Sequence, residues 1–359
     1  MAAIHLEQLR HSYRVKPRDG VDADWALRGL DLHWKDGGAY ALLGPSGCGK
    51  TTLLNLISGL LMPTHGRIRF GERDVTPLEP RERNIAQVFQ FPVVYDTMSV
   101  FDNLAFPLRN RGIAHADVER RVHEIAAMLD LDRMLPQRAA GLTADGKQKI
   151  SLGRGLVRAD VAAILFDEPL TVIDPHLKWR LRSKLKELHQ RVGLTMVYVT
   201  HDQTEALTFA DQVVVMIDGQ VVQAGTPVEL FERPRHTFVG HFIGSPGMNV
   251  LPCEIDMSGV ARVAGHAVPV ASRDGATAAG GKKTEIGVRP EFVRFADAGL
   301  PVRVERVSDI GRFRIVDARL GEHALKALIA EGQTVPAEQG HVVFDPARTQ
   351  LYADGWIVD

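Results

Sequence analysis

The chain has 359 residues, with 43 lysine and arginine residues against 44 aspartate and glutamate residues. This length exceeds one ordinary domain of roughly 100–200 residues, so we expect a large domain and a smaller one. The charges nearly cancel and no lysine–arginine block occurs, which argues against a nucleic-acid partner.

The two cysteines, Cys48 and Cys253, lack the spacing of a metal site. So low a number of cysteines is typical of free thiols in a reducing cytosol and not of a secreted protein held by disulfides. No apolar run approaches the roughly 18 residues needed to span a bilayer, and the N-terminal residues lack a long apolar stretch. We therefore expect no transmembrane segment in this chain, so any membrane function must come through partner chains.

Along the first part of the chain, β-type runs alternate with helical patterns. This alternation predicts an α/β domain in which helices cover a sheet. Asp174 and Pro175 are suited to the N-cap and the first position of the longest helix, whose apolar residues recur at helical spacing. The runs, in chain order, are AYALLG (39–44), TTLLNLISGLL (51–61), AAILFDE (162–168), PHLKWRLRSKLKELHQRV (175–192) and TMVYVTHD (195–202).

A hairpin is expected to close this first domain. The runs VVVMI (213–217) and QVVQ (220–223) flank Asp218-Gly219. This dipeptide tolerates the positive φ angles of a two-residue turn.

A domain boundary is predicted at the helix-breaking sequence GSPG, residues 244–247. Beyond it, short β-rich runs alternate with glycine-rich turns, which is typical of a small barrel of short strands. We therefore predict domains at 1–244 and 245–359, with a loop at 275–283 inside the second.

A phosphate-binding loop is predicted immediately after the apolar run 39–43. The sequence GPSGCGKT matches the P-loop pattern and precedes a helix-forming stretch. Its glycines let backbone N–H groups converge on phosphate oxygens, Lys50 reaches the β- and γ-phosphates, and Thr51 offers a hydroxyl to Mg²⁺. The nucleotide-binding residues expected here are Gly44, Pro45, Ser46, Gly47, Cys48, Gly49, Lys50, Thr51 and Thr52.

Two acidic residues, Asp167 and Glu168, end the apolar run 162–168. In a nucleotide-hydrolysing protein, the first carboxylate can hold Mg²⁺ and the second can polarise the attacking water. Such a run is otherwise a strand end with solvated charges, and the P-loop upstream favours the catalytic interpretation.

Further motifs follow the P-loop in the order shown by ABC ATPases, which the chain resembles. They are VFQFPVVYDTMSV with Gln90, LTVIDPHL with Asp174, and TMVYVTHDQTEAL with His201. Later, IGVRPEFVR (286–294) and FDPARTQLY (344–352) resemble the C-terminal OB-like, TOBE-type domain of maltose-like carbohydrate importer ATPases. The implied fold is an α/β P-loop NTPase, an ABC cassette with a helical subdomain at about 91–158, followed by a small all-β OB-like accessory domain.

The resemblance implies roles for three further residues. Gln90 would contact Mg²⁺ or the attacking water, and His201 would touch the γ-phosphate and orient that water. Tyr13 would stack on adenine, but a surface aromatic is an open alternative because Trp25 lies in the same segment. The implied catalytic set is Glu168, His201 and Gln90, and the implied Mg²⁺ set is Thr51, Gln90 and Asp167.

The signature motif of the family is altered in this chain. ABC ATPases carry Leu-Ser-Gly-Gly-Gln at a helix N-terminus that faces the γ-phosphate held by the other subunit. Ala144 and Asp145 add β-carbons and a negative charge where glycines let the backbone approach phosphate, so closure on that nucleotide should weaken. An open alternative is that Asp145 turns outward and caps the helix while Gly146 takes over the close approach. The altered stretch, LTADG, is Leu142, Thr143, Ala144, Asp145 and Gly146.

Two other parts of the chain would contact partner chains. The resemblance places Asp174 at the interface of two cassettes, where its role as helix N-cap is compatible with that contact. The residues after Gln90, through Phe106, correspond to the family's groove for a coupling helix of the membrane protein. Their aromatic residues are equally compatible with a core; they are Phe91, Tyr95, Phe101 and Phe106.

The resemblance as a whole implies an ATPase coupled to transport, with ATP and Mg²⁺ as cofactors. The implied partners are a second ABC ATPase subunit, two transmembrane permease subunits and, through the permease, a substrate-binding protein. Because of the altered signature, we expect the second ATPase subunit to be non-identical. The implied location is peripheral, at the cytoplasmic face of the bacterial inner membrane.

A narrower resemblance concerns the cargo. The sequences LTADGKQKISLGRGLVR, LTVIDPHLKW and FVGHFIGSPGMNVL are similar to one of the two ATPase subunits of bacterial glycerol-type importers. A sugar or glycerol-3-phosphate importer with a homodimeric cassette pair remains an alternative. A non-transport ABC ATPase is a weaker one, since no tandem cassette, long coiled coil, zinc module or basic linker is visible.

Overall fold

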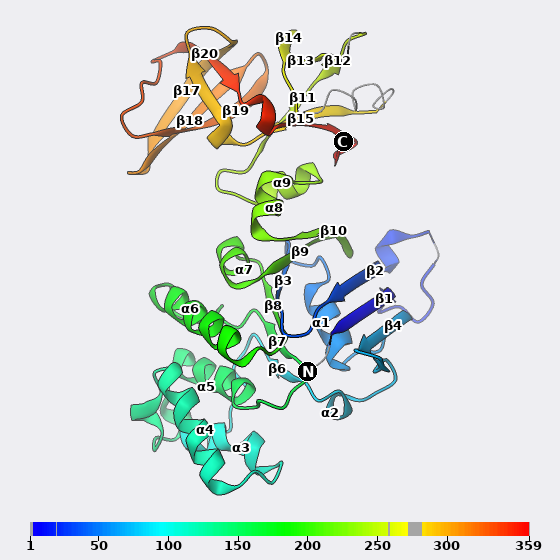
Figure 1. Ribbon diagram of the computed structural model, residues 1–359, viewed down its shortest axis with the longest axis vertical. Helices are drawn as coiled ribbons and strands as arrows, with labels where there is room; N and C mark the ends of the chain where they lie inside the picture. The colour runs from blue at the N-terminus through cyan, green and yellow to red at the C-terminus, as the bar shows by residue number, and fades with distance from the viewer. Residues whose placement is uncertain (1–2, 19, 258, 272–281, 359) are drawn as a thin grey trace. The chain divides into compact units, whose positions relative to one another are not determined.

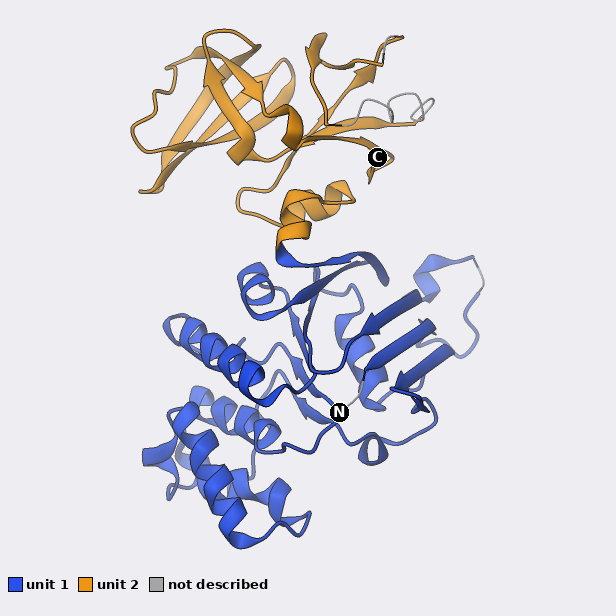
Figure 2. Ribbon diagram, in the orientation of Figure 1, with its two compact units in different colours: residues 1–227 blue, residues 228–359 orange. Residues whose placement is uncertain are grey.

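The computed structural model describes residues 3–18, 20–257, 259–271 and 282–358. The chain divides into two compact units, residues 1–227 and residues 228–359 (Figure 2). The first unit is α/β and the second is largely β, which confirms the predicted fold class. Among the described residues, no helix is long and apolar enough to cross a membrane.

A six-stranded sheet forms the centre of the first unit, in the order β10-β9-β3-β8-β7-β6. All neighbouring pairs are parallel except β9 and β10. The strands β3 and β8 are buried along their whole length, as expected for parallel strands covered on both faces. Because parallel strands end at the same edge, the residues after β3, β7 and β8 meet there. The bounds are β3 (Ala39–Leu43), β6 (Ala86–Val88), β7 (Ile164–Asp167), β8 (Met196–Thr200), β9 (Gln212–Ile217) and β10 (Gln220–Gly225).

A second, antiparallel sheet has the order β2-β1-β4-β5. Its apolar residues share one buried cluster with those of the six-stranded sheet and of helix α1 (Lys50–Ser58). Leu53, Leu54 and Ile57 of α1 have no exposed surface, so this helix is held firmly behind the P-loop. The strands are β1 (Ile4–His11), β2 (Leu27–Trp34), β4 (His65–Phe70) and β5 (Arg73–Asp74).

The helical subdomain gathers at one end of the first unit (Figure 1). Its close packing depends on Gly153, where an added β-carbon would come within 2.4 Å of a Leu104 methyl group. The helices between β5 and β7 are α2 (Pro80–Arg83), α3 (Val100–Arg109), α4 (His115–Met128) and α5 (Ala144–Leu156), with short 3₁₀ turns at Asp132–Met134 and Ala139–Gly141.

Two local predictions in the first unit are confirmed. Helix α6 (Pro175–Val192) begins at Asp174, whose carboxylate accepts a hydrogen bond from the backbone N–H of His176 at 2.9 Å. The turn between β9 and β10 has positive φ at both Asp218 (46°) and Gly219 (76°), as a two-residue hairpin turn requires. Helix α7 (Gln203–Phe209) follows β8.

Among the described residues of the second unit are the short helices α8 (Pro227–Glu232), whose first residue belongs to the first unit, and α9 (Thr237–Phe242). The described strands form sheets with the orders β11-β15-β21-β22, β12-β13-β14 and β16-β20-β17-β18-β19. Of the predicted loop 275–283, residues 275–281 lie outside the described residues. The strands are β11 (Asn249–Pro252), β12 (Glu254–Ile255), β13 (Ala261–Val263), β14 (His266–Val268), β15 (Thr284–Val288), β16 (Val293–Ala296), β17 (Leu300–Asp309), β18 (Phe313–Leu320), β19 (His323–Ala330), β20 (Gln339–Phe344), β21 (Thr349–Ala353) and β22 (Trp356–Ile357).

Arg289 ties α8 and α9 to the strands of the second unit. Its side chain is buried and donates hydrogen bonds to the carbonyl oxygens of Phe231 (2.6 Å) and Ile243. Burial lowers the pKa of this guanidinium to about 10. Tyr352 adds a buried hydrogen bond to the carbonyl of Pro234 at 2.9 Å. Both helix ends are therefore capped by residues far along the chain. The two compact units divide after Pro227, the first residue of α8, and the GSPG sequence lies within the second unit.

Two truncations test where the first unit ends. A chain ending at Pro227 is expected to be soluble and stabilised by nucleotide, because residues 1–227 form a compact unit. A chain ending at Gly244 keeps α8 and α9 without Arg289, so these residues should be trimmed by protease back to about Pro227. Limited proteolysis with mass spectrometry measures the trimming. A protease-resistant 1–244 fragment, or a 1–227 fragment that nucleotide does not stabilise, would contradict the prediction.

Candidate functional site

The P-loop connects β3 to α1, and its shape requires glycine. Gly47 and Gly49 have φ of 82° and 99°, in the left-handed region that side chains disfavour. At Gly44, a β-carbon would come within 2.3 Å of the Met216 carbonyl oxygen. At Gly47, by contrast, no atom lies within 4 Å of such a β-carbon, so this part of the loop is open to a ligand.

Lys50 places its ammonium group at the centre of this loop. The side chain is buried and donates hydrogen bonds of 2.8 Å to the carbonyl oxygens of Gly44 and Pro45. Among the described residues, no carboxylate lies within ion-pair distance of this ammonium, so its charge is available to an anionic ligand. Cys48, 3.6 Å from it, is a buried free thiol whose pKa is raised by burial.

Thr51 and Asp167 form the second part of the site. The Thr51 hydroxyl donates to the Asp167 carboxylate at 3.1 Å. Burial raises the pKa of Asp167, while the hydrogen bond from Thr51 lowers it. Among the described residues, no group of three or more His, Cys, Asp or Glu side chains could hold a metal ion. One carboxylate with one hydroxyl still fits Mg²⁺, which takes few protein oxygens and completes its shell with phosphate and water.

Glu168 is the point where three other side chains converge. One of its carboxylate oxygens lies 3.1 Å from His201 Nδ1. The same oxygen accepts hydrogen bonds of 3.3 Å from the Gln90 amide and from the Thr171 hydroxyl. Glu168 has φ of 46°, a strained conformation for a non-glycine residue, and such strain is concentrated at functional sites. A carboxylate held in this way can accept a proton from a nearby water.

These groups line one open hollow of about 580 Å³ in the first unit. Two lining residues, Ala26 and Thr171, were not predicted. Thr171 could have been suspected because it lies three residues after Glu168, whereas Ala26 lines the hollow without any sequence signal. The lining residues are Tyr13, Ala26, Ser46, Gly47, Gly49, Lys50, Thr51, Thr52, Gln90, Glu168, Thr171 and His201.

Ten of the predicted site residues do not line this hollow. Gly44, Pro45 and Cys48 shape the P-loop behind it, and Asp167 reaches it only through Thr51. The signature residues Leu142, Thr143, Ala144, Asp145 and Gly146, together with Asp174, belong to the starts of α5 and α6.

Tyr13 and Trp25, the two aromatic residues of the N-terminal segment, have different environments. Tyr13 is 66% exposed, and its hydroxyl lies 3.0 Å from the Thr52 hydroxyl at the start of α1. Trp25 is buried and has the Arg10 guanidinium 3.9 Å from its ring centre. Of the two, only Tyr13 lines the hollow.

The altered signature occupies the first turn of α5. Thr143 is the N-cap, and its hydroxyl accepts a hydrogen bond from the backbone N–H of Gly146 at 3.3 Å. Asp145 therefore does not cap the helix, and that part of the alternative interpretation is wrong. One of its carboxylate oxygens lies 3.5 Å from the Lys149 ammonium, and the other is buried without a hydrogen-bond partner. Lys149 thus offsets part of the negative charge expected here.

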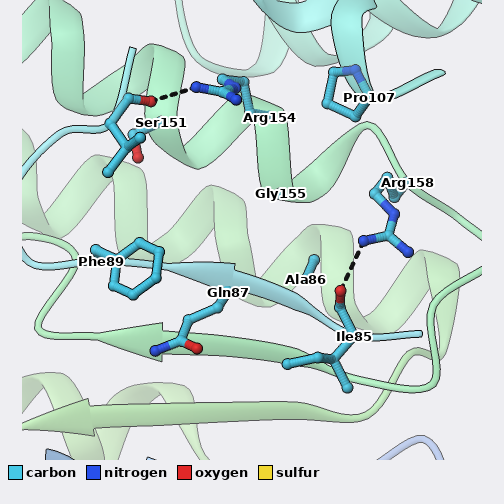
Figure 3. A pocket seen from close by; sticks show the side chains of 10 residues that line it. Ile85, Ala86, Gln87, Phe89, Pro107, Ser151, Arg154, Gly155 and Arg158 are labelled. Carbon is cyan, nitrogen blue, oxygen red and sulfur yellow. Dashed lines mark hydrogen bonds between the residues drawn. The ribbon is translucent and has the colours of Figure 1, made fainter. Parts of the chain in front are cut away.

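A second hollow, of about 210 Å³, lies between β6 and the second half of α5 (Figure 3). Two arginines border it: Arg154 donates to the Val93 carbonyl oxygen at 2.6 Å, and Arg158 donates to the Ile85 carbonyl oxygen at 2.7 Å. The four aromatic residues between Gln90 and Phe106 are all at least partly exposed, and Phe91 is 71% exposed, so none of them is a fully buried core residue.

Comparison with known proteins identifies both parts of the chain. The family model described as ABC transporter matches residues 27–171, and the one described as MalK OB fold domain matches residues 244–293. The second match confirms the predicted OB-like domain.

Curated relatives match over most of their length. The sn-glycerol-3-phosphate import ATP-binding protein UgpC of Bordetella avium is 40% identical over 299 residues, covering 83% of this chain and 82% of that protein. The sulfoquinovosyl glycerol transport ATP-binding protein SmoE of Agrobacterium fabrum is 36% identical over 360 residues, covering 98% of both chains.

Solved structures resemble roughly two thirds of the chain. The ATP-binding cassette MJ0796, solved as a dimer bound to ADP and Pi, has a TM-score of 0.55 at 25% identity and covers 62% of this chain and 98% of that one. The cassette cbiO1 from Clostridium perfringens has a TM-score of 0.56 at 26% identity, and the match covers 64% of this chain and 90% of that one. With the P-loop, the paired carboxylates and the OB-like domain, these matches show that the chain belongs to the ABC transporter family, as an ATP-binding subunit of the maltose-like importer group.

Proposed function

We propose that this chain hydrolyses ATP to drive import of a small polyol, glycerol, as a peripheral subunit at the cytoplasmic face of the bacterial inner membrane. One observation carries the ATPase mechanism: Lys50, the Thr51–Asp167 pair and Glu168 with its three partners all meet at one edge of the sheet. The same edge collects the ends of β3, β7 and β8, so the groups are held by the most deeply buried strands of the unit.

Each group has a separate task in this mechanism. The P-loop amides and Lys50 bind the β- and γ-phosphates, and Tyr13 stacks on the adenine. Thr51, Asp167 and Gln90 would hold Mg²⁺, which would neutralise charge on the phosphates. Glu168 accepts the proton of the attacking water, and His201, 3.1 Å from Glu168, keeps that water in line with the γ-phosphate.

Coupling to the membrane requires permease subunits, and we place their contact at the hollow between β6 and α5. This hollow is lined by exposed apolar side chains, including Phe89 (38%) and Val93 (51%), together with the side chains of Arg154 and Arg158. An amphipathic segment of the permease can cover the apolar lining. A substrate-binding protein then acts through the permease.

The cargo is proposed from the relatives, because no part of the ATPase contacts it. UgpC is named for sn-glycerol-3-phosphate and SmoE for sulfoquinovosyl glycerol, and both compounds contain a glycerol unit. The test is the reconstituted importer with its binding protein, assayed for ATPase stimulation by glycerol, glycerol-3-phosphate and maltose. We expect stimulation by glycerol. Stimulation by only one of the other two compounds would overturn the cargo assignment, and no ATP hydrolysis with any of them would overturn the mechanism.

We also propose that the second cassette is a different chain. In the family, each ATP lies between one chain's P-loop and the other chain's signature. A partner with Leu-Ser-Gly-Gly-Gln would complete this chain's site, whereas the partner's own ATP would face Ala144 and Asp145. The charge of Asp145 is offset only in part, since one of its oxygens is buried without a partner. A residual cost of about 1–2 kcal/mol would weaken closure there roughly tenfold, so two copies of this chain would give two poor sites.

The composition of the purified importer tests this pairing. Intact-mass analysis is expected to find two cassette chains of different mass. Glu168→Gln in this chain should then reduce ATPase activity more than the equivalent substitution in the partner, because hydrolysis concentrates at this chain's P-loop. A complex with two identical copies at full ATPase rate, or a larger loss from the partner's substitution, would overturn the pairing.

A further inference from the structure

In the segment that carries Tyr13 between β1 and β2, described at residues 12–18 and 20–26, several contacts converge on one buried carboxylate. The side chain of Asp24 has no exposed surface. One of its oxygens accepts hydrogen bonds from both the backbone N–H and the guanidinium of Arg18, each at 3.0 Å. The other oxygen lies 3.2 Å from the guanidinium of Arg14. Hydrogen bonds from Arg18 hold the pKa of Asp24 at about 2, so the group is ionised at any physiological pH.

Both chain neighbours of Tyr13 are tied to this aspartate. Arg14, on one side, forms the ion pair with the Asp24 carboxylate. Ser12, on the other side, donates its hydroxyl hydrogen to the Asp24 carbonyl oxygen at 2.5 Å and accepts a hydrogen bond from the backbone N–H of Arg14 at 3.0 Å. The backbone on either side of Tyr13 is therefore held by a single residue eleven positions along the chain.

The Tyr13 ring itself has few contacts of its own. It is 66% exposed, meets the buried His11 ring edge to face at 4.8 Å, and reaches Thr52 through its hydroxyl. A ring held so lightly would sample many orientations if its backbone were free, and ordering it on binding would cost affinity.

We propose that Asp24 is a positioning residue for nucleotide recognition: it holds the loop so that the Tyr13 ring is already set for the base. The inference rests on the proposed stacking of Tyr13 on adenine. Asp24 does not line the hollow, and it contacts none of the groups that handle phosphate. Its effect should therefore be confined to ligands that contain a base.

The experiment compares Asp24→Ala with Asp22→Ala in the full chain within the purified importer. Asp22 lies in the same short 3₁₀ turn, but its side chain is 71% exposed and pairs with Arg28 outside the Tyr13 loop contacts. The two readouts are kcat and KM for ATP, and the inhibition constant of inorganic triphosphate, which lacks a base. Asp24→Ala is expected to raise KM about tenfold with kcat unchanged, a part of the usual contribution of base stacking. The triphosphate constant should stay the same, and Asp22→Ala should match the parent in both readouts.

Two further variants separate the possible failures. Tyr13→Ala should raise KM at least as much as Asp24→Ala, and the double variant should be no worse than Tyr13→Ala alone, since both act through the ring. If Tyr13→Ala leaves KM unchanged, the proposed adenine contact is wrong. If Tyr13→Ala raises KM but Asp24→Ala does not, only the positioning role is wrong. Weaker inhibition of Asp24→Ala by inorganic triphosphate would also contradict the positioning role, because triphosphate contains no base. Should Asp24→Ala fail to fold, Arg18→Met, which removes the main partner from the loop surface, is expected to give the same KM increase.

Discussion

Replacing Glu168 with glutamine is expected to slow ATP hydrolysis by about 10²–10⁴-fold while leaving ATP binding unchanged. Glutamine has nearly the same shape as glutamate and can still accept hydrogen bonds from Gln90 and Thr171 through its amide oxygen. It cannot accept a proton from the attacking water at neutral pH. Only the chemical step should therefore suffer, and ATP should accumulate in the site.

The measurement is single-turnover hydrolysis together with ATP binding on the same preparation of the importer. Glu187→Gln is a matched control, because this residue has an exposed side chain on α6, away from the hollow. The control should hydrolyse ATP at the parental rate. Hydrolysis by Glu168→Gln at that same rate would mean that another group accepts the proton.

Replacing Lys50 with methionine is expected to weaken ATP binding by about 100-fold or more, since charge-assisted bonds to phosphate in a buried site are strong. Methionine keeps the apolar stem that packs at the start of α1, and it removes the ammonium. Two effects then add: the phosphates lose a cation that no carboxylate competes for, and the carbonyl groups of Gly44 and Pro45 lose their donor.

Calorimetric titration with ATP and a thermal melt measure the two effects separately. Lys35→Met, on the exposed surface before β3, controls for the loss of one positive charge. Lys35→Met should bind ATP as the parent does. Tight ATP binding by Lys50→Met would show that the backbone amides of the loop suffice. Together, the two substitutions distinguish binding from turnover: Glu168→Gln should bind ATP without hydrolysing it, and Lys50→Met should bind ATP only weakly.

Several features were predictable from the sequence because they depend on residues within one turn of each other. The P-loop requires glycine for backbone reasons that are visible in the pattern itself, because Gly47 and Gly49 adopt positive φ angles. The N-cap at Asp174 and the hairpin at Asp218-Gly219 are likewise local, and both are confirmed. The α/β fold class followed from the alternation of buried runs and helical patterns over the first part of the chain.

The tertiary structure decided which distant residues become partners. Gln90, Glu168 and His201 follow strands that are far apart along the chain, and they meet because β6, β7 and β8 are neighbours in the sheet. The apolar run that ends in Asp167-Glu168 behind a P-loop already indicated Glu168, whereas only the resemblance to a family indicated Gln90 and His201. Their catalytic roles remain predictions for the experiments above.

Tertiary structure also decided the roles of residues that the sequence analysis did not identify. Arg289 donates hydrogen bonds to the ends of two helices that precede it by some fifty residues, and these helices lie in the same compact unit as Arg289, apart from the first residue of α8. Asp24 and Lys149 are ordinary charged residues in the sequence, and only packing shows that Asp24 is fully buried and that Lys149 faces Asp145. Local sequence determines backbone shape because its interactions span a few residues. The partners of a charged side chain depend on strand order and burial, which only the folded chain defines.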